Sequence, residues 1–170
     1  MVLSCLTLGS LIAIAVYTDL RYRRIPNALL VPFAVLGLAV QAIGFGWPGV
    51  ADAAAGFGLG LVLLLPAYLA GGIGGGDVKL LATIGVIGGA TFVWKTFLAG
   101  AIIGGLLALI QLVVERRLLA VLKELVFWLW TVLTPGARPA PLAKLDSERK
   151  WGRLPYAVPL ALGVIISWLW

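Results

Sequence analysis

The chain has 170 residues, of which 62% are hydrophobic and only 12% charged, and its mean hydropathy of +1.08 is too high for a water-soluble domain. Histidine is absent and Cys5 is the single cysteine, which excludes an internal disulfide, histidine-dependent triads and the usual zinc and haem ligands. Any acid–base chemistry must therefore use carboxylates, lysine or tyrosine. We interpret the net charge of +6 first as a signal of membrane orientation.

Six segments approach the roughly 20 apolar residues that a helix needs to cross a bilayer. In chain order they are about 2–18, 27–46, 52–71, 78–94, 96–115 and 154–170. The first lacks a basic n-region and a small-residue cleavage site, so we interpret it as a retained span and not as a signal peptide. The sequence thus predicts an all-α polytopic membrane protein with a single membrane-embedded domain, 1–170.

The segment at about 118–133 has an apolar stripe that Lys123 and Glu124 interrupt, so we predict an interfacial helix that lies along the membrane surface. Cytoplasmic loops collect lysine and arginine near the ends of spans. With six spans and an outside N-terminus, every basic residue except Lys95 faces the cytoplasm. A seventh span at 118–133 would move the basic loop 138–153 outside, so charge placement favours six.

Pairs of glycines four residues apart recur in the predicted spans, as is typical where membrane helices approach closely. They are Gly56 and Gly60, Gly85 and Gly89, and Gly100 and Gly104. The alternative is that glycine is simply common in membrane helices.

Most of the seven acidic residues have a sufficient structural interpretation. Asp52 begins the predicted third span and would cap that helix. Four others lie among or beside basic residues, as ion pairs do: Glu115, Glu124, Asp146 and Glu148. Asp19 and Asp77 remain, and the topology inferred from the basic residues puts both at the cytoplasmic face.

Five of the six residues at 71–76, just before Asp77, are glycine. Glycine costs about 1 kcal/mol relative to alanine inside a helix, so this run fits a turn or a broken helix instead. Two carboxyl groups held close share one proton and supply both the acid and the base for peptide hydrolysis. In the structural alternative, Asp19 only pairs with Arg23 and Asp77 only caps the next helix.

Residues 19–27 (DLRYRRIPN) and 74–79 (GGGDVK) resemble the two signatures of the type IV prepilin peptidases, a family that includes archaeal preflagellin peptidases. The second signature matches the G-x-G-D pattern of intramembrane aspartic peptidases, and the resemblance covers about residues 5–115. It implies a catalytic pair of Asp19 and Asp77, with Gly74 and Gly76 shaping the loop. Lys79 matches a recurring basic position, and a lysine that only snorkels to the inside face is an equal alternative.

The resemblance also implies a substrate and a location. A prepilin or pseudopilin with a short basic leader would be cleaved after a glycine, at the cytoplasmic face of a bacterial-type inner membrane. We expect no metal, no cofactor and no nucleic-acid partner. Larger bacterial members that also N-methylate pilins carry an extra N-terminal cytoplasmic region, often with two cysteine pairs, and this chain resembles the short peptidase-only form. We therefore expect no methyl transfer.

Two other classes of function stay open. A small proton- or cation-coupled transporter would use paired membrane carboxylates and a glycine-broken helix, but no ionisable residue lies near the centre of a predicted span. A scaffold without chemistry would leave the glycine run unexplained. The sequence does not identify the substrate-binding residues or the oligomeric state.

Overall fold

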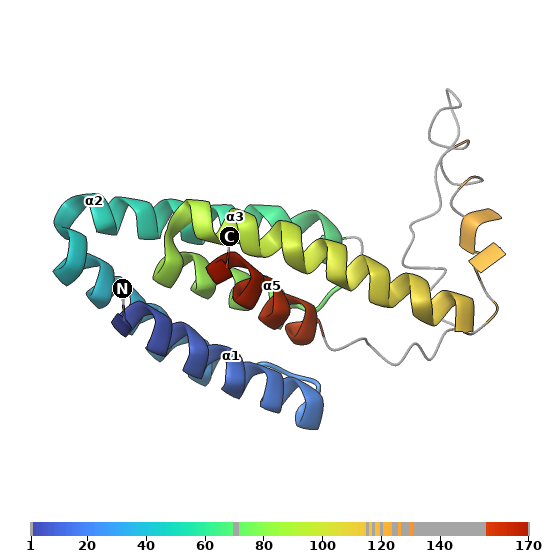
Figure 1. Ribbon diagram of the computed structural model, residues 1–170, viewed down its shortest axis with the longest axis horizontal. Coiled ribbons are helices and arrows are strands. Elements are labelled where there is room, and N and C mark those ends of the chain that lie inside the picture. Colours follow the sequence, from blue (N-terminus) through green and yellow to red (C-terminus); the bar gives the residue numbers. More distant parts are fainter. Residues whose placement is uncertain are drawn as a thin grey trace. The chain divides into compact units, whose positions relative to one another are not determined.

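The computed structural model describes residues 2–69, 72–114 and 156–169, together with positions 116, 118, 119, 121–123, 126 and 130. In this part of the chain the regular elements are all helices: α1 (Val2–Tyr22), α2 (Asn27–Leu69), α3 (Gly75–Val114) and α5 (Ala157–Leu169) (Figure 1). The predicted all-α fold is confirmed. Contacts divide the chain into two units, Met1–Gly104 with Pro155–Trp170, and Gly105–Leu154. The candidate site lies in the first.

Helix α2 consists of two helices that join at Gly46. This residue has φ 63° and ψ −145°, a left-handed conformation that glycine adopts without the penalty of a β-carbon. Gly49 then packs directly against the carbonyl oxygen of Gln41, so the second half folds back beside the first. The halves correspond to the predicted segments 27–46 and 52–71, but the second starts before residue 52, because Pro48 is tolerated in the first turn of a helix.

Helix α3 breaks in the same way at Gly89, which has φ 83° and ψ 176°. The sequence analysis placed this break at Lys95, between segments 78–94 and 96–115. The difference arises because a lysine can stay helical and extend its side chain to the membrane surface, whereas glycine accepts the positive φ of the bend. The first predicted segment therefore ends earlier than residue 94.

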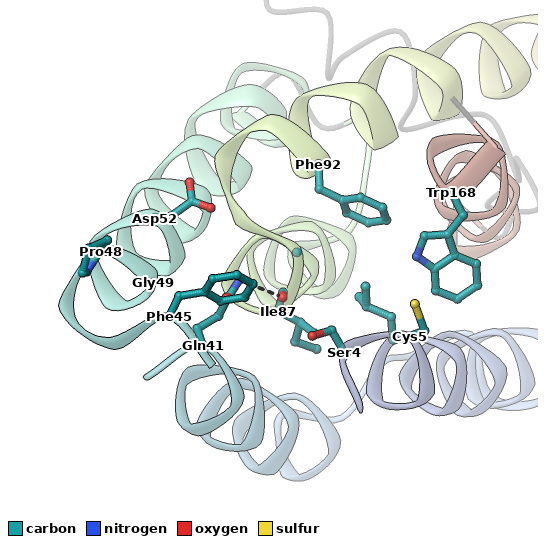
Figure 2. Close-up of a pocket in the computed structure, with 12 residues that line it drawn as sticks. Ser4, Cys5, Gln41, Phe45, Pro48, Gly49, Asp52, Ile87, Phe92 and Trp168 are labelled. Carbon is teal, nitrogen blue, oxygen red and sulfur yellow. Dashed lines mark hydrogen bonds between the residues drawn. The ribbon is translucent and has the colours of Figure 1, made fainter. Parts of the chain in front are cut away.

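Two side chains of α2 bind the backbone groups that the break in α3 leaves without helical partners. Buried Gln41 donates from Nε2 to the carbonyl oxygen of Ile87 at 3.1 Å, before the break, as Figure 2 shows. After the break, Asp52 accepts a hydrogen bond at Oδ1 from the Ala90 N–H at 3.1 Å. The expectation that Asp52 caps its own helix differs from this structure: Asp52 lies inside α2 and binds the start of a neighbouring helix.

The paired glycines lie at helix contacts, as predicted. A β-carbon on Gly56 would collide with the Gly85 carbonyl group, and one on Gly60 would lie 2.7 Å from the Cα of Ala82. The second half of α2 therefore runs antiparallel to the first half of α3, backbone against backbone.

Helix α5 packs antiparallel to both α1 and the second half of α3 (Figure 1). Near its end, Ser167 and Thr96 share a buried hydrogen bond of 3.1 Å between their hydroxyl oxygens. At its start, Ala157 lies beside the end of α1. The antiparallel direction of α5 thus places its first residues beside the last turn of α1.

Helices α1, α2 and α3 are long and apolar enough to cross a membrane. Large apolar side chains point outward along them, with Val35, Ile43 and Leu65 exposed, as expected when the surrounding solvent is lipid. The two bends give six apolar helical segments in the predicted order, but six crossings stay a prediction. The interfacial helix predicted at 118–133 lies largely outside the described residues, and the positions described there are helical.

Candidate active site

Asp19 is the one buried carboxylate among the residues that the structure describes, with 8% of its surface exposed. It lies in the last turn of α1, and its Oδ2 accepts a hydrogen bond from the Ala157 N–H at 3.3 Å. The helix ends after Tyr22, where Arg23 takes a left-handed conformation (φ 51°) and donates its N–H to the Asp19 carbonyl oxygen at 2.8 Å. Since burial of a carboxylate is costly, this position points to a function.

Asp77 lies in the first turn of α3 and is held by the glycine loop. Its Oδ2 accepts a hydrogen bond from the Gly74 N–H at 3.1 Å, and its own N–H donates to the Gly74 carbonyl oxygen at 3.1 Å. The first bond is half of a capping box, in which the side chain of the third helical residue binds the N–H of the residue before the helix, and the second is a backbone turn. Asp77 therefore helps to cap α3 from inside its first turn, and not as the N-cap residue that the sequence suggested. This bond fixes the carboxylate without excluding chemistry, because a carboxylate offers about four lone-pair sites.

The two sequence signatures meet in space. A β-carbon on Gly76 would lie 3.3 Å from the Cβ of Ile25, so the glycine loop packs against the turn that follows α1. Lys79 donates from Nζ to the side-chain oxygen of Asn27 at 3.1 Å. The start of α3 is thus bound to the start of α2, and Asp77 is brought to the end of α1 that carries Asp19.

The residues at the start of α5 lie beside the first of the two carboxylates, Asp19. Ala157 binds Asp19 through its backbone N–H, while the ring of the neighbouring Tyr156 packs beside Gly104 of α3.

The sequence analysis missed Tyr156 and Ala157. Both lie beyond residues 5–115, which carry the resemblance, and a tyrosine at the start of an apolar segment has no signature of its own. Only the antiparallel packing of α5 against α1 places them near Asp19. Asn27 stood inside the first signature, but its contact with Lys79 depends on how α2 and α3 pack.

This arrangement suits proton transfer between paired acids. Two carboxyl groups near each other ionise in coupled steps, and one proton then serves both. In the described ranges, the structure contains no group of three or more His, Cys, Asp or Glu side chains that could hold a metal ion.

A separate pocket of about 380 Å³ lies toward the other end of the bundle (Figure 2). Its lining is mostly apolar and includes Cys5, Phe45, Phe92 and Trp168, with Asp52 at one side. Cys5 and Asp19 are about 21 Å apart along α1, at about 1.5 Å per residue. The pocket is therefore not part of the carboxylate site.

Comparisons with known proteins agree with these observations. A family model described as the type IV leader peptidase family matches residues 6–109. The chain is also 34% identical over 100 residues to the prepilin leader peptidase/N-methyltransferase of Bacillus subtilis (strain 168), which is 57% of this chain and 40% of that protein. The chain thus covers less than half the length of this relative. No solved structure matches the chain. The matched range contains Asp19 and Asp77 and stops before α5.

Proposed function

Because the chain belongs to the type IV leader peptidase family, we propose that it is an intramembrane aspartic endopeptidase with Asp19 and Asp77 as its catalytic pair. The substrate is a prepilin-like protein, and the short basic leader is removed after a glycine at the cytoplasmic membrane face. The observation that carries the proposal is the packing of the glycine loop before Asp77 against Ile25, in the turn that follows the helix of Asp19.

In the proposed reaction the pair holds one proton. The ionised carboxylate takes a proton from a water molecule as this water attacks the scissile carbonyl carbon, and the protonated carboxyl group donates a hydrogen bond to the carbonyl oxygen. Collapse of the tetrahedral intermediate breaks the C–N bond, and a proton from the pair goes to the leaving amine. The pair is then ready for the next water.

The neighbouring residues serve to keep this geometry. Gly74 binds the Asp77 carboxylate through its N–H, and Gly76 lets the loop approach Ile25, where a side chain would press on it. Lys79 donates a hydrogen bond to Asn27 and so joins the start of α3 to the start of α2. We assign these residues positioning roles and keep Lys79 outside the proton-transfer steps.

The first test measures leader removal in cells that co-express the protein with candidate prepilins. Cleavage is detected as a change in the gel mobility of the prepilin. Asp19→Asn and Asp77→Asn keep the size of each side chain and remove its proton chemistry. We expect each to lower cleavage about a thousandfold or more while the protein still inserts in the membrane. Asp52→Asn is the matched control, because Asp52 binds a backbone N–H elsewhere in the bundle and asparagine can still accept that bond.

The same experiment separates the other classes of function. Processing at the normal rate by either Asp19→Asn or Asp77→Asn would contradict the proposal and fit a scaffold. A transporter would carry protons or cations in reconstituted vesicles without cutting any prepilin.

Methyl transfer is a separate question, since the name of the Bacillus relative joins two activities and the match covers 40% of that protein. We propose that this chain acts as a peptidase only, in line with its resemblance to the short form. Incubation of the purified protein with a cleaved pilin and radiolabelled S-adenosylmethionine should leave the pilin unlabelled. Incorporation of label above that of a control without the protein would contradict this part.

A further inference from the structure

We propose that α5 completes the active site, and that Ala157 is a positioning residue whose backbone N–H holds the Asp19 carboxylate in its reactive orientation. The inference rests on the proposed function and extends it to a helix that lies outside the family match at residues 6–109.

The bond between Ala157 and Asp19 joins two groups that are both shielded from solvent. Ala157 is fully buried and Asp19 is 8% exposed, and the N–H donates to Oδ2 at 3.3 Å. Ala157 is the first residue of α5, so its N–H has no carbonyl partner within its own helix. Because a buried donor and a buried carboxylate each lose their bonds to water, each one satisfies the other here.

Helix α5 lies beside α1 over most of its length. A β-carbon on Gly9 of α1 would lie 3.9 Å from the ring of Trp168, near the end of α5, and Ala157 binds Asp19 at the other end. These two contacts are about 15 Å apart along α1 and about 17 Å apart along α5, at about 1.5 Å per residue. The similar spacings agree with two antiparallel helices in one register, and this register sets the position of the Ala157 N–H.

Helix α3 holds α5 from a second side. A β-carbon on Gly163 of α5 would lie 2.6 Å from the carbonyl oxygen of Thr96, and the hydroxyl groups of Ser167 and Thr96 share a hydrogen bond of 3.1 Å. One turn further along α3, Gly100 packs against the same helix. Since α5 is packed against both α1 and α3, its first N–H is a donor with a fixed position.

A fixed donor restricts the orientation of the Asp19 carboxylate. With Oδ2 bound to Ala157, the second oxygen of the carboxylate can carry the shared proton. Catalysis by paired acids requires the reacting groups to be held in a productive geometry, and small misplacements are costly in rate. Loss of the Ala157 N–H should therefore slow the chemical step and leave substrate binding unchanged.

The first test compares Ala157→Pro with the wild-type full-length protein in proteoliposomes, with a prepilin as substrate. Proline has no N–H and is tolerated at the first position of a helix. We expect kcat to fall about tenfold or more, the effect of losing a hydrogen bond to a charged group, with KM within about twofold because Ala157 is fully buried. Ala157→Val is the matched control, since valine adds bulk at the same site and keeps the N–H. Unchanged kcat in Ala157→Pro, or an equal loss in Ala157→Val, overturns the inference.

The thermal unfolding midpoint in detergent gives a second readout that does not depend on cleavage. Asparagine in place of Asp19 can still accept the Ala157 N–H, whereas leucine, of similar size, leaves this donor buried without a partner. We expect Asp19→Leu to unfold about 2–4 °C below Asp19→Asn, and we expect this gap to close when both are combined with Ala157→Pro. A gap of the same size in both backgrounds, or no gap at all, contradicts the inference. If Ala157→Pro does not fold, the comparison of the two Asp19 variants alone decides.

Failure of the proposed function has a different signature. If the wild-type protein does not cleave prepilins, or Asp19→Asn still cleaves them, the peptidase assignment itself is wrong. If the wild type cleaves, Asp19→Asn does not, and Ala157→Pro behaves as the wild type, only the role of Ala157 is refuted.

Discussion

At the scale of single residues, the two acids that we propose as the catalytic pair also have structural roles. Asp77 caps α3 through Gly74, and Asp19 fastens α5 through Ala157. The structural interpretations that the sequence left open are thus not rivals of catalysis. A carboxylate held by backbone donors is a carboxylate with a fixed position, and fixed position is what a paired-acid mechanism requires.

Lys79 illustrates a residue whose role needed the structure. The sequence offered a snorkelling side chain or a catalytic one, whereas the structure shows a bond to Asn27 at 3.1 Å that joins α3 to α2. We predict that Lys79→Met and Asn27→Ala each lower kcat of prepilin cleavage about 3- to 10-fold, in line with one lost hydrogen bond. The double variant should be no worse than either single one, and Asn27→Asp should retain activity. A loss from Lys79→Met as large as that from Asp77→Asn would make Lys79 catalytic instead.

At the scale of elements, the bends in α2 and α3 determine which helices face each other. Gly89 breaks α3, and Gln41 and Asp52 from α2 bind the backbone groups on either side of the break. The break therefore depends on how α2 packs against α3 and not on the sequence of α3 alone. A pattern of charges along the sequence cannot locate such a break, so the predicted boundary at Lys95 was wrong. The break lies at Gly89, because glycine accepts the positive φ of the bend.

The break leads to a prediction about stability. Gly89→Ala forces an L-residue into φ 83° and brings a β-carbon against the Asp52 carboxylate, so the variant should be destabilised by about 1–3 kcal/mol. The measurement is the thermal unfolding midpoint of the purified protein in detergent. Gly58→Ala is the matched control, since a β-carbon there meets nothing within 4 Å and alanine favours a helix. Equal midpoints for the two variants would refute the role of Gly89.

At the scale of the whole molecule, the sequence predicted much of what surrounds the carboxylates. Hydropathy identified the apolar segments, and the two signatures identified Asp19 and Asp77 on segments that the structure brings together. The start of α5 could not be predicted, because Ala157 reaches Asp19 only through antiparallel packing across 138 positions of sequence. The role of Asp52 was missed for the same reason, since its partner Ala90 lies in another helix.

The bends bear on the predicted number of membrane crossings. Helix α2 has 43 residues and would extend about 65 Å if straight, roughly twice the hydrocarbon thickness. The reversal at Gly46 lets the same residues cross twice. In the proposed topology, both ends of α2 lie at the face that carries the paired acids, and its middle lies at the other face.

This arrangement can be tested with single cysteines and a membrane-impermeant maleimide, in a background with Cys5→Ala. Trp47, Arg24 and Leu69 are suitable positions because all three are exposed. If α2 crosses twice and its ends are cytoplasmic, Trp47→Cys reacts in intact spheroplasts, whereas Arg24→Cys and Leu69→Cys react only after the membrane is permeabilised. If α2 crossed once, Arg24→Cys and Leu69→Cys would react from opposite sides. The loops carrying Asp19 and Asp77 would then be separated by the bilayer, and the two carboxylates could not share a proton.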